Sequence, residues 1–213
     1  MRHLKRQKAP KNWPIERKGK KFVVSGNEKG IPILIAIRDV LKIAKNRKEV
    51  KRAIAKKAIL LSNKAVKKDR EIAFLLDTIT IVPSKKTYRV ILSESGKFNL
   101  EEAKKSDETK KVSKVIGKKI LKGKKTQANL WDGRNFIYNK KFNVNDSVVI
   151  DLKKNSIETV LPLKKDAKAL VIGGKHTGKE GKIKNINDSL KSVELDTKKG
   201  TYNVLIKQIM IIE

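Results

Sequence analysis

The chain has no cysteine, only two histidines, few aromatic side chains and far fewer acidic than basic residues. Without cysteine it can form no disulfide, thiolate nucleophile or cysteine-based zinc site, and His3 and His176 alone argue against a histidine-based metal site. No apolar run approaches the ~18–20 residues that cross a bilayer, and the basic N-terminus has no apolar segment behind it of the kind found in signal peptides. We therefore expect a soluble cytosolic protein with no metal, no other cofactor and no membrane partner.

Positive charge is what the chain has in excess. Its 213 residues include 53 Lys and Arg against 22 Asp and Glu, a formal net charge of +31. Such self-repulsion weakens a compact state, and a polyanion relieves it because each neutralised phosphate releases condensed counterions. A lysine-rich compositional bias can add a few charges but hardly thirty. The composition therefore predicts a nucleic-acid partner.

The apolar content is too low for one large core. Hydrophobic residues make up 38% of the chain and charged residues 35%, which favours several small modules with modest cores. We predict an α+β, mostly β chain of four parts: a basic N-terminal arm (1–31), a module of two helices and a hairpin (32–83), a central β barrel-like domain (84–164) and a C-terminal small barrel (165–213).

Two helices and a hairpin are predicted after the arm. Apolar residues recur at helical spacing from Pro32 and form one stripe, made of Ile33, Ile37, Val40, Leu41 and Ala44. Asn46 and Glu49 then form a capping box that opens a second helix, and short strands with turns follow up to Pro83.

From Thr87 onward the pattern favours strands every 8–12 residues, which is typical of small barrels. Asn99–Glu102 resembles another capping box and predicts a short helix there. Asp132–Gly133 is the strongest hairpin signal in the chain, because a two-residue type I′ turn prefers Asp-Gly. Trp131, beside this turn, is expected in the barrel core rather than as a platform for stacked bases.

A glycine-rich segment between two predicted strands, 170–183, has two interpretations. Gly173, Gly178 and Lys179 have the spacing of a phosphate-binding P-loop, but Glu180 stands where that loop needs Ser or Thr, and a strand follows instead of a helix. The alternative is a hairpin loop in which Gly178 and Gly181 adopt backbone angles that other residues avoid. The segment resembles a KOW motif, found in small SH3-like barrels of ribosomal proteins and elongation factors.

Several segments together resemble one family, the archaeal and eukaryotic small-subunit ribosomal protein S-four-e (S4e). They are His3–Arg6 with Ala9–Trp13, the helical module Ile33–Ile81, the stretches Leu130–Asn135 and Val144–Leu152, and the KOW loop. The helical module (32–83) resembles the S-four-type RNA-binding module, and the KOW loop implies an SH3-like barrel at 165–213. Asn145 departs from the expected pattern, which has glycine there, and the chain ends at Glu213 without the longer basic extension of larger members.

The resemblance implies a structural, non-enzymatic component of the small ribosomal subunit. It would bind small-subunit ribosomal RNA directly, contact neighbouring ribosomal proteins, support subunit assembly and translation, and take no small-molecule substrate. Basic side chains on the arm, the helical pair and the loops are the expected contacts with phosphates and sugars. They are Arg2, His3, Lys5, Arg6, Lys8, Lys11, Trp13, Arg38, Lys42, Lys45, Arg47, Lys51, Arg52, Arg134, Lys175, His176 and Lys179. Lys85 and Lys86 are expected to be solvated.

Two other classes of protein compete with this interpretation. Similar helical modules occur on RNA-modifying enzymes, but the sequence has no nucleophile–base set, and Asp69, Glu71 and Asp77 are expected to balance charge rather than to catalyse. The alternative kept open is a KOW-type transcription or translation elongation factor, which would leave the arm and the helical module unexplained.

Overall fold

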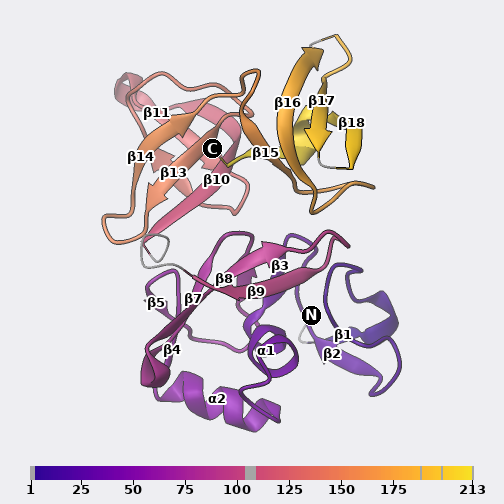
Figure 1. The fold of residues 1–213 in the computed structure, drawn as a ribbon. Coiled ribbons are helices and arrows are strands. Elements are labelled where there is room, and N and C mark those ends of the chain that lie inside the picture. Colours follow the sequence, from indigo (N-terminus) through magenta and orange to yellow (C-terminus); the bar gives the residue numbers. More distant parts are fainter. Residues whose placement is uncertain (1–2, 104–108, 188, 198, 213) are drawn as a thin grey trace. The chain divides into compact units, whose positions relative to one another are not determined.

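The chain folds into two compact units in a computed structural model, which describes residues 3–103, 109–187, 189–197 and 199–212 (Figure 1). The first unit comprises residues 1–93 and 97–109, and the second comprises residues 94–96 and 110–213. Strands dominate both units, so the expected mostly β class is confirmed. Arg2, one of the predicted RNA contacts, lies outside the described residues.

The first unit contains three antiparallel sheets among its described residues. Two of them have two strands each, β1 (His3–Lys5) with β2 (Phe22–Val24) and β3 (Gly30–Pro32) with β6 (Ile72–Phe74). The third has the order β5-β4-β7-β8-β9, with β4 at Ile59–Leu61, β5 at Lys64–Ala65, β7 at Thr78–Ile81, β8 at Lys86–Leu92 and β9 at Phe98–Glu102. Short 3-10 turns lie at Arg6–Lys8 and Val82–Ser84.

This third sheet corrects two expectations. The proposed domain boundary at residue 84 lies inside it, because β7 pairs with β8 in the register Thr80↔Thr87. The short helix expected at Asn99–Glu102 is strand β9 instead. Phe98 and Leu100 are buried while Asn99 between them is exposed, so the two-residue period of a half-buried strand prevails over the local capping signal.

The first predicted helix is much shorter than its apolar spacing indicates. It consists of α1 (Ile33–Ile35) and a π-helical turn at Ala36–Val40, and Lys42 leaves the helical conformation with φ 54°. The residues from Ile33 to Ile37 are buried consecutively rather than along one stripe. A segment surrounded by core on all sides does not need an amphipathic pattern, so the period was a poor guide to its length.

The second helix, α2 (Arg47–Ala55), forms as predicted. The Asn46 side chain accepts a hydrogen bond from the Glu49 backbone N–H at 3.0 Å, and the Glu49 carboxylate accepts one from the Lys45 backbone N–H at 2.7 Å. Asn46 thereby satisfies an N–H group that the first turn leaves unpaired, and Glu49 reaches back to the residue before the cap. Val50 and Ile54 are buried, which leaves the opposite, basic face of α2 exposed.

The N-terminal arm is part of the core of the first unit. Trp13 is only 1% exposed, and its indole N–H donates to the carbonyl of Gly30 at 2.8 Å. The backbone N–H of Phe98 donates to the carbonyl of Asn12 at 2.8 Å, which ties the arm to the start of β9. The prediction that Trp13 contacts RNA is therefore wrong, because its ring is enclosed by protein.

The second unit contains two five-stranded antiparallel sheets among its described residues. The first has the order β12-β11-β10-β13-β14, with β10 at Lys110–Ile120, β11 at Thr126–Leu130, β12 at Asn135–Ile137, β13 at Ser147–Asp151 and β14 at Ser156–Leu161. The second has the order β18-β17-β16-β15-β19, with β15 at Lys168–Val171, β16 at Glu180–Asn187, β17 at Ser192–Thr197, β18 at Gly200–Leu205 and β19 at Ile209–Ile211. Short 3-10 turns lie at Lys122–Lys124 and Ile206–Gln208.

Each sheet of the second unit has its own hydrophobic core, and buried polar contacts join the two. The ammonium of Lys114 on β10 donates to the carbonyl of Ile206 at 2.5 Å, and the Ser147 hydroxyl on β13 accepts from the Ile211 N–H on β19 at 2.9 Å. Burial lowers the pKa of Lys114 to about 8, because the charged form loses its hydration. The polar contacts at this junction are therefore buried.

The Asp-Gly hairpin forms, but its turn differs from the predicted type I′. Three residues separate Leu130 from Arg134, whose carbonyl accepts the Leu130 N–H at 2.9 Å, and only Gly133 (φ 84°) among them has a positive φ. Asp132 turns inward instead and pairs with Lys111 at 2.7 Å, both side chains being 1% exposed. A three-residue loop with glycine in the left-handed position lets that carboxylate reach its buried partner.

Candidate nucleic-acid interface

A groove of about 760 Å³ in the first unit brings the arm together with the helical segments. Its basic lining comes from segments far apart in the sequence: His3, Arg6, Lys18, Lys20, Arg38, Lys45 and Arg47. Only Glu16 and Asp39 among its lining residues are acidic. The predicted residues His3, Arg6, Arg38, Lys45 and Arg47 therefore line one concave surface, although no local pattern in the sequence predicts that they lie together.

Several arginines around this groove have structural partners. Arg6 donates to the carbonyls of Lys20 and Glu16, each at 2.7 Å, and Arg17 donates to the carbonyl of Ala9 at 2.6 Å. These contacts hold the arm in shape. Arg38 pairs with the neighbouring Asp39 at 2.7 Å.

Lysines supply the accessible charge of the groove. Lys18, Lys20 and Lys45 are exposed, and no ion pair is recorded for them within the described part of the chain. Lys18 and Lys20 were missed by sequence reasoning, although they lie in a basic run, Arg17–Lys21, that could have indicated them. The groove therefore combines arginines held by hydrogen bonds or ion pairs with exposed lysine ammonium groups.

A second groove of about 430 Å³ lies between α2 and the segment that precedes β6. Arg47 crosses to Asp69 at 2.5 Å, and this ion pair ties the first turn of α2 to that segment. The groove is lined by Arg47, Lys51, Ile54, Ala55, Lys67, Lys68, Asp69 and Arg70. Lys67, Lys68 and Arg70 were also missed, although their run in the sequence is almost entirely basic.

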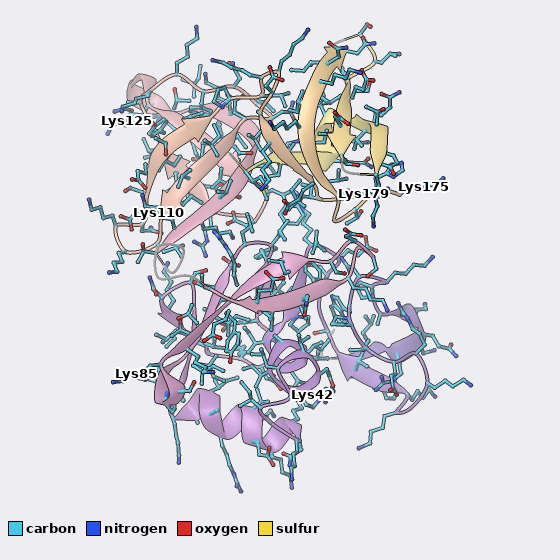
Figure 2. All side chains as sticks on the ribbon, in the orientation of Figure 1. Lys42, Lys85, Lys110, Lys125, Lys175 and Lys179 are labelled. Carbon is cyan, nitrogen blue, oxygen red and sulfur yellow. The ribbon has the colours of Figure 1, made fainter. Side chains whose placement is uncertain are left out.

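The outer face of α2 continues this basic surface. Lys48, Lys51 and Arg52 are all exposed, as are Lys42 and Lys45 just before the helix. Figure 2 shows Lys42 beside the helical segments of this unit. Because Lys48, Lys51 and Arg52 are three and four residues apart on α2, they lie on one side of the helix and present a concentrated positive field suited to phosphates.

The other predicted contacts on the arm are more scattered. Lys5, Lys8 and Lys11 are exposed, and the ring of His3 packs edge-on against Phe22 with 4.7 Å between centroids.

The acidic residues weighed as a cluster in the first unit are structural. Glu71 accepts from the backbone N–H of Lys67 at 2.9 Å, and Asp77 accepts from the Ser62 hydroxyl at 2.7 Å. They therefore stabilise local turns, whereas Asp69 ties its segment to α2 through Arg47. Over the residues that the structure describes there is no group of three or more His, Asp or Glu that could hold a metal ion, and no helix long and apolar enough to span a membrane.

In the second unit, the KOW loop between β15 and β16 presents the remaining predicted cations. Lys175 is exposed, whereas the ring of His176 packs on Tyr202 with 4.5 Å between centroids. The Lys179 ammonium lies over the same Tyr202 ring, 3.6 Å from its centroid. Figure 2 shows Lys175 and Lys179 at this loop. Tyr202 therefore orients two of the three side chains, and only Lys175 extends without such support.

Glycine shapes the KOW loop in two ways. Gly174 and Gly178 both have φ 88°, in the left-handed region that favours glycine. Gly181 does not, contrary to expectation: a Cβ added there would lie 2.4 Å from the Asp196 carbonyl oxygen. Close approach of β17, rather than an unusual backbone angle, requires glycine at this position.

Arg134, Trp131 and Asn145 are further residues of the second unit for which the sequence makes a prediction. Arg134 is half-buried with its Nε 3.7 Å from Asp132, so part of its charge is already compensated. Trp131 is half-buried rather than fully in the core. Asn145 has φ 77°, and asparagine is the residue that best replaces glycine in that conformation.

Comparison with known proteins gives matches along almost the whole chain. Residues 1–27 match the RS4NT (NUC023) domain, residues 84–157 match Ribosomal family S4e, and residues 165–196 match the KOW motif. Small ribosomal subunit protein eS4 of Methanothermobacter thermautotrophicus is 35% identical over 87% of this chain and 79% of its own. The eS4 protein of Methanocella arvoryzae is 31% identical over 99% of this chain and 93% of its own.

The fold also has a counterpart among solved structures. The crystal structure of the 30S ribosomal protein S4e from Thermoplasma acidophilum superimposes with a TM-score of 0.74, at 24% identity, over 87% of this chain and 96% of that one. The likeness extends over both units, so the arrangement of strands described above is shared with that protein.

Proposed function

The chain belongs to the ribosomal S4e family and has a structural role in the ribosome, and from this premise we propose that it binds small-subunit ribosomal RNA directly. The binding surface is the pair of grooves in the first unit together with the outer face of α2. Neighbouring ribosomal proteins are its further partners, and the ribosome is its location. The elongation-factor alternative is supported only by the KOW motif at residues 165–196.

The observation that carries this proposal is the convergence of basic side chains on the groove of about 760 Å³. Lys18 and Lys20 from the arm and Lys45 before α2 line one surface. Positive side chains held close together repel one another in the free protein. Bound phosphates neutralise these charges and so relieve the repulsion. The grooves are therefore best explained as binding sites for an RNA backbone.

The basic side chains contribute to binding in two ways. Lys45, Lys48, Lys51 and Arg52 reach phosphate oxygens, which positions the RNA without reading its sequence. Arg38 and Arg47, held by Asp39 and Asp69, present their remaining N–H donors from fixed positions. Recognition then depends on the shape of a folded RNA, as is usual for A-form helices.

The test is the salt dependence of binding by the full chain. The RNA is small-subunit ribosomal RNA of Methanothermobacter thermautotrophicus, whose eS4 protein is 35% identical. Log K should fall linearly with log salt. In the triple variant Lys48→Gln/Lys51→Gln/Arg52→Gln, we expect the slope to fall by about 2, because each lost phosphate contact removes ~0.7–0.9.

A matched control has the same charge change elsewhere in the first unit. Lys85→Gln/Lys86→Gln/Lys97→Gln alters three exposed lysines outside both grooves and should leave the slope within experimental error. Equal losses in the two variants would overturn the assignment of the surface. Binding that ignored salt, or a chain that did not co-sediment with small subunits, would overturn the proposal itself.

A further inference from the structure

The hairpin of β10 and β11 carries a second positive surface, in the unit that lacks the two grooves. Between residues 109 and 145 the sequence has eleven Lys and Arg and a single acidic residue, Asp132. That carboxylate is 1% exposed and paired with Lys111. The solvent-facing part of this long stretch therefore has no carboxylate of its own.

The strands of the hairpin pair close to its tip. Its strands pair from Gly117↔Asn129 to Ile120↔Thr126, and the Leu121 N–H donates to the Lys125 carbonyl at 2.8 Å. Gly123 makes the turn with φ 77° and has nothing within 4 Å of an added Cβ, so the tip is open to solvent. Figure 2 shows Lys125 at this tip.

The lysines of the hairpin fall into two kinds. Lys118 is structural, since its ammonium lies 4.9 Å from the centroid of the Phe142 ring and donates to the Phe142 carbonyl at 3.3 Å. Lys119, Lys122 and Lys125 are exposed, and no ion pair is recorded for them within the described residues. These three ammonium groups are available to an anionic partner.

Apolar side chains are exposed beside these cations. Ile120 is 73% exposed. Ile137, on strand β12 next to β11, is 58% exposed. An isolated exposed isoleucine is unremarkable, but Ile120 is the last residue of β10, at the base of the turn that carries Lys122. Ammonium groups around an exposed apolar side chain at a hairpin tip match a nucleic-acid strand, whose phosphates alternate with riboses and bases.

Another hairpin of the same unit shows that this pattern is not general. The β16–β17 hairpin also has an exposed apolar residue, Leu190 at 69%, and exposed lysines at 184 and 191. Its strands, however, carry the carboxylates of Glu180 and Glu194. Lysines there have acidic neighbours, whereas those of the β10–β11 tip have none between residues 112 and 131.

We propose that the β10–β11 hairpin tip is a second binding site for structured RNA, in which Lys119, Lys122 and Lys125 contact phosphates and Ile120 packs on a ribose or base. This site rests on the proposed function, because it supposes that the same ribosomal RNA is the ligand. It is independent of the grooves and of the KOW loop, which lie on other elements.

Two variants of the full chain separate the charged and apolar contributions. Lys119→Gln/Lys122→Gln/Lys125→Gln should lower the slope of log K against log salt by about 2. Ile120→Ser should weaken binding several-fold at every salt concentration and leave the slope unchanged, because no phosphate contact is lost. Lys184→Gln/Lys191→Gln/Lys207→Gln, the matched control in the same unit, should leave the slope within error.

The outcomes distinguish this site from the function on which it rests. If the hairpin variant keeps the slope of the unmodified chain while the α2 variant lowers it, the hairpin site is overturned and RNA binding stands. If both keep it, both proposals fail. A hairpin variant that binds RNA normally but no longer co-sediments with subunits would assign the tip to a protein partner and overturn the RNA site.

The absence of cysteine provides a direct second measurement. A single Lys122→Cys substitution can carry a tethered cleavage reagent at the tip, and Ser189→Cys carries it on the control hairpin. We expect discrete cuts in the ribosomal RNA from the first position and diffuse or no cuts from the second. Discrete cuts from Ser189→Cys alone would contradict the proposal.

Discussion

The two units build their interiors differently. In the first, one hydrophobic cluster extends from Ala9 in the arm to Leu100 in β9. In the second, each five-stranded sheet has a separate cluster, and Lys114 and Ser147 connect the two through buried hydrogen bonds. The first unit thus has one continuous apolar core built from distant segments, whereas the second has two separate apolar cores joined by buried polar contacts.

This difference determines which substitutions each unit tolerates. Buried polar groups stabilise only when fully paired, and losing one partner leaves the other desolvated. A continuous apolar core has no such partner to lose, but a large side chain removed from it leaves a cavity. The units should therefore respond to different kinds of substitution.

The largest effect is expected for Trp13→Ala. Removing this enclosed ring from the first unit should lower the free energy of unfolding of that unit by about 4 kcal/mol. Urea unfolding monitored by hydrogen exchange, which resolves the two units, measures it. Trp131→Ala is the matched control, because Trp131 is only half-buried, and it should cost clearly less. Equal effects would show that the arm is not part of the core.

The next effect is expected for Lys111→Met in the second unit. It leaves the Asp132 carboxylate buried without its ammonium partner, which should lower the free energy of unfolding by about 3 kcal/mol. Lys110, on the same strand, is 2.9 Å from Glu158 in an exposed pair, so Lys110→Met should cost less than about 1 kcal/mol. Denaturant unfolding of the two variants gives the comparison, and similar losses would contradict the buried pair.

The smallest effect is a pH dependence at the polar junction. The pKa of Lys114 is lowered to about 8 in the folded chain from 10.5, so between these values the unfolded state binds more protons and stability rises with pH. From pH 8 to 10, Lys114 should add about 2 kcal/mol to the free energy of unfolding. Lys114→Met should lack this increment, measured as the difference between the two unfolding curves. Parallel curves would show that Lys114 keeps its ordinary pKa.

Much of the second unit could be predicted from the sequence. Its strands alternate apolar and polar residues and are separated by turn signals, so local pattern and tertiary structure agree at strands such as β14 and β17. The turn at Asp132 escaped prediction because its buried partner, Lys111, is far away in sequence. The turn between Leu130 and Arg134 is therefore shaped by an ion pair with a distant residue, which local sequence patterns do not indicate.

The first unit was harder to predict because its core is assembled from distant segments. The period of the residues after Pro32 indicated a stripe, yet Ile33 to Ile37 are buried on all sides. Trp13 looked like a contact for RNA because its neighbours are basic and polar, although its own ring is enclosed. Residue type identified the basic surface, but only the fold shows which cations line a groove and which hold the arm.

The link between Asn12 and Phe98 has a consequence for the order of synthesis. The arm leaves the translating ribosome long before β9 does. Arg6 and Arg17 can bond within the arm at once, but the arm completes its native packing only after Phe98, at the start of β9, has emerged.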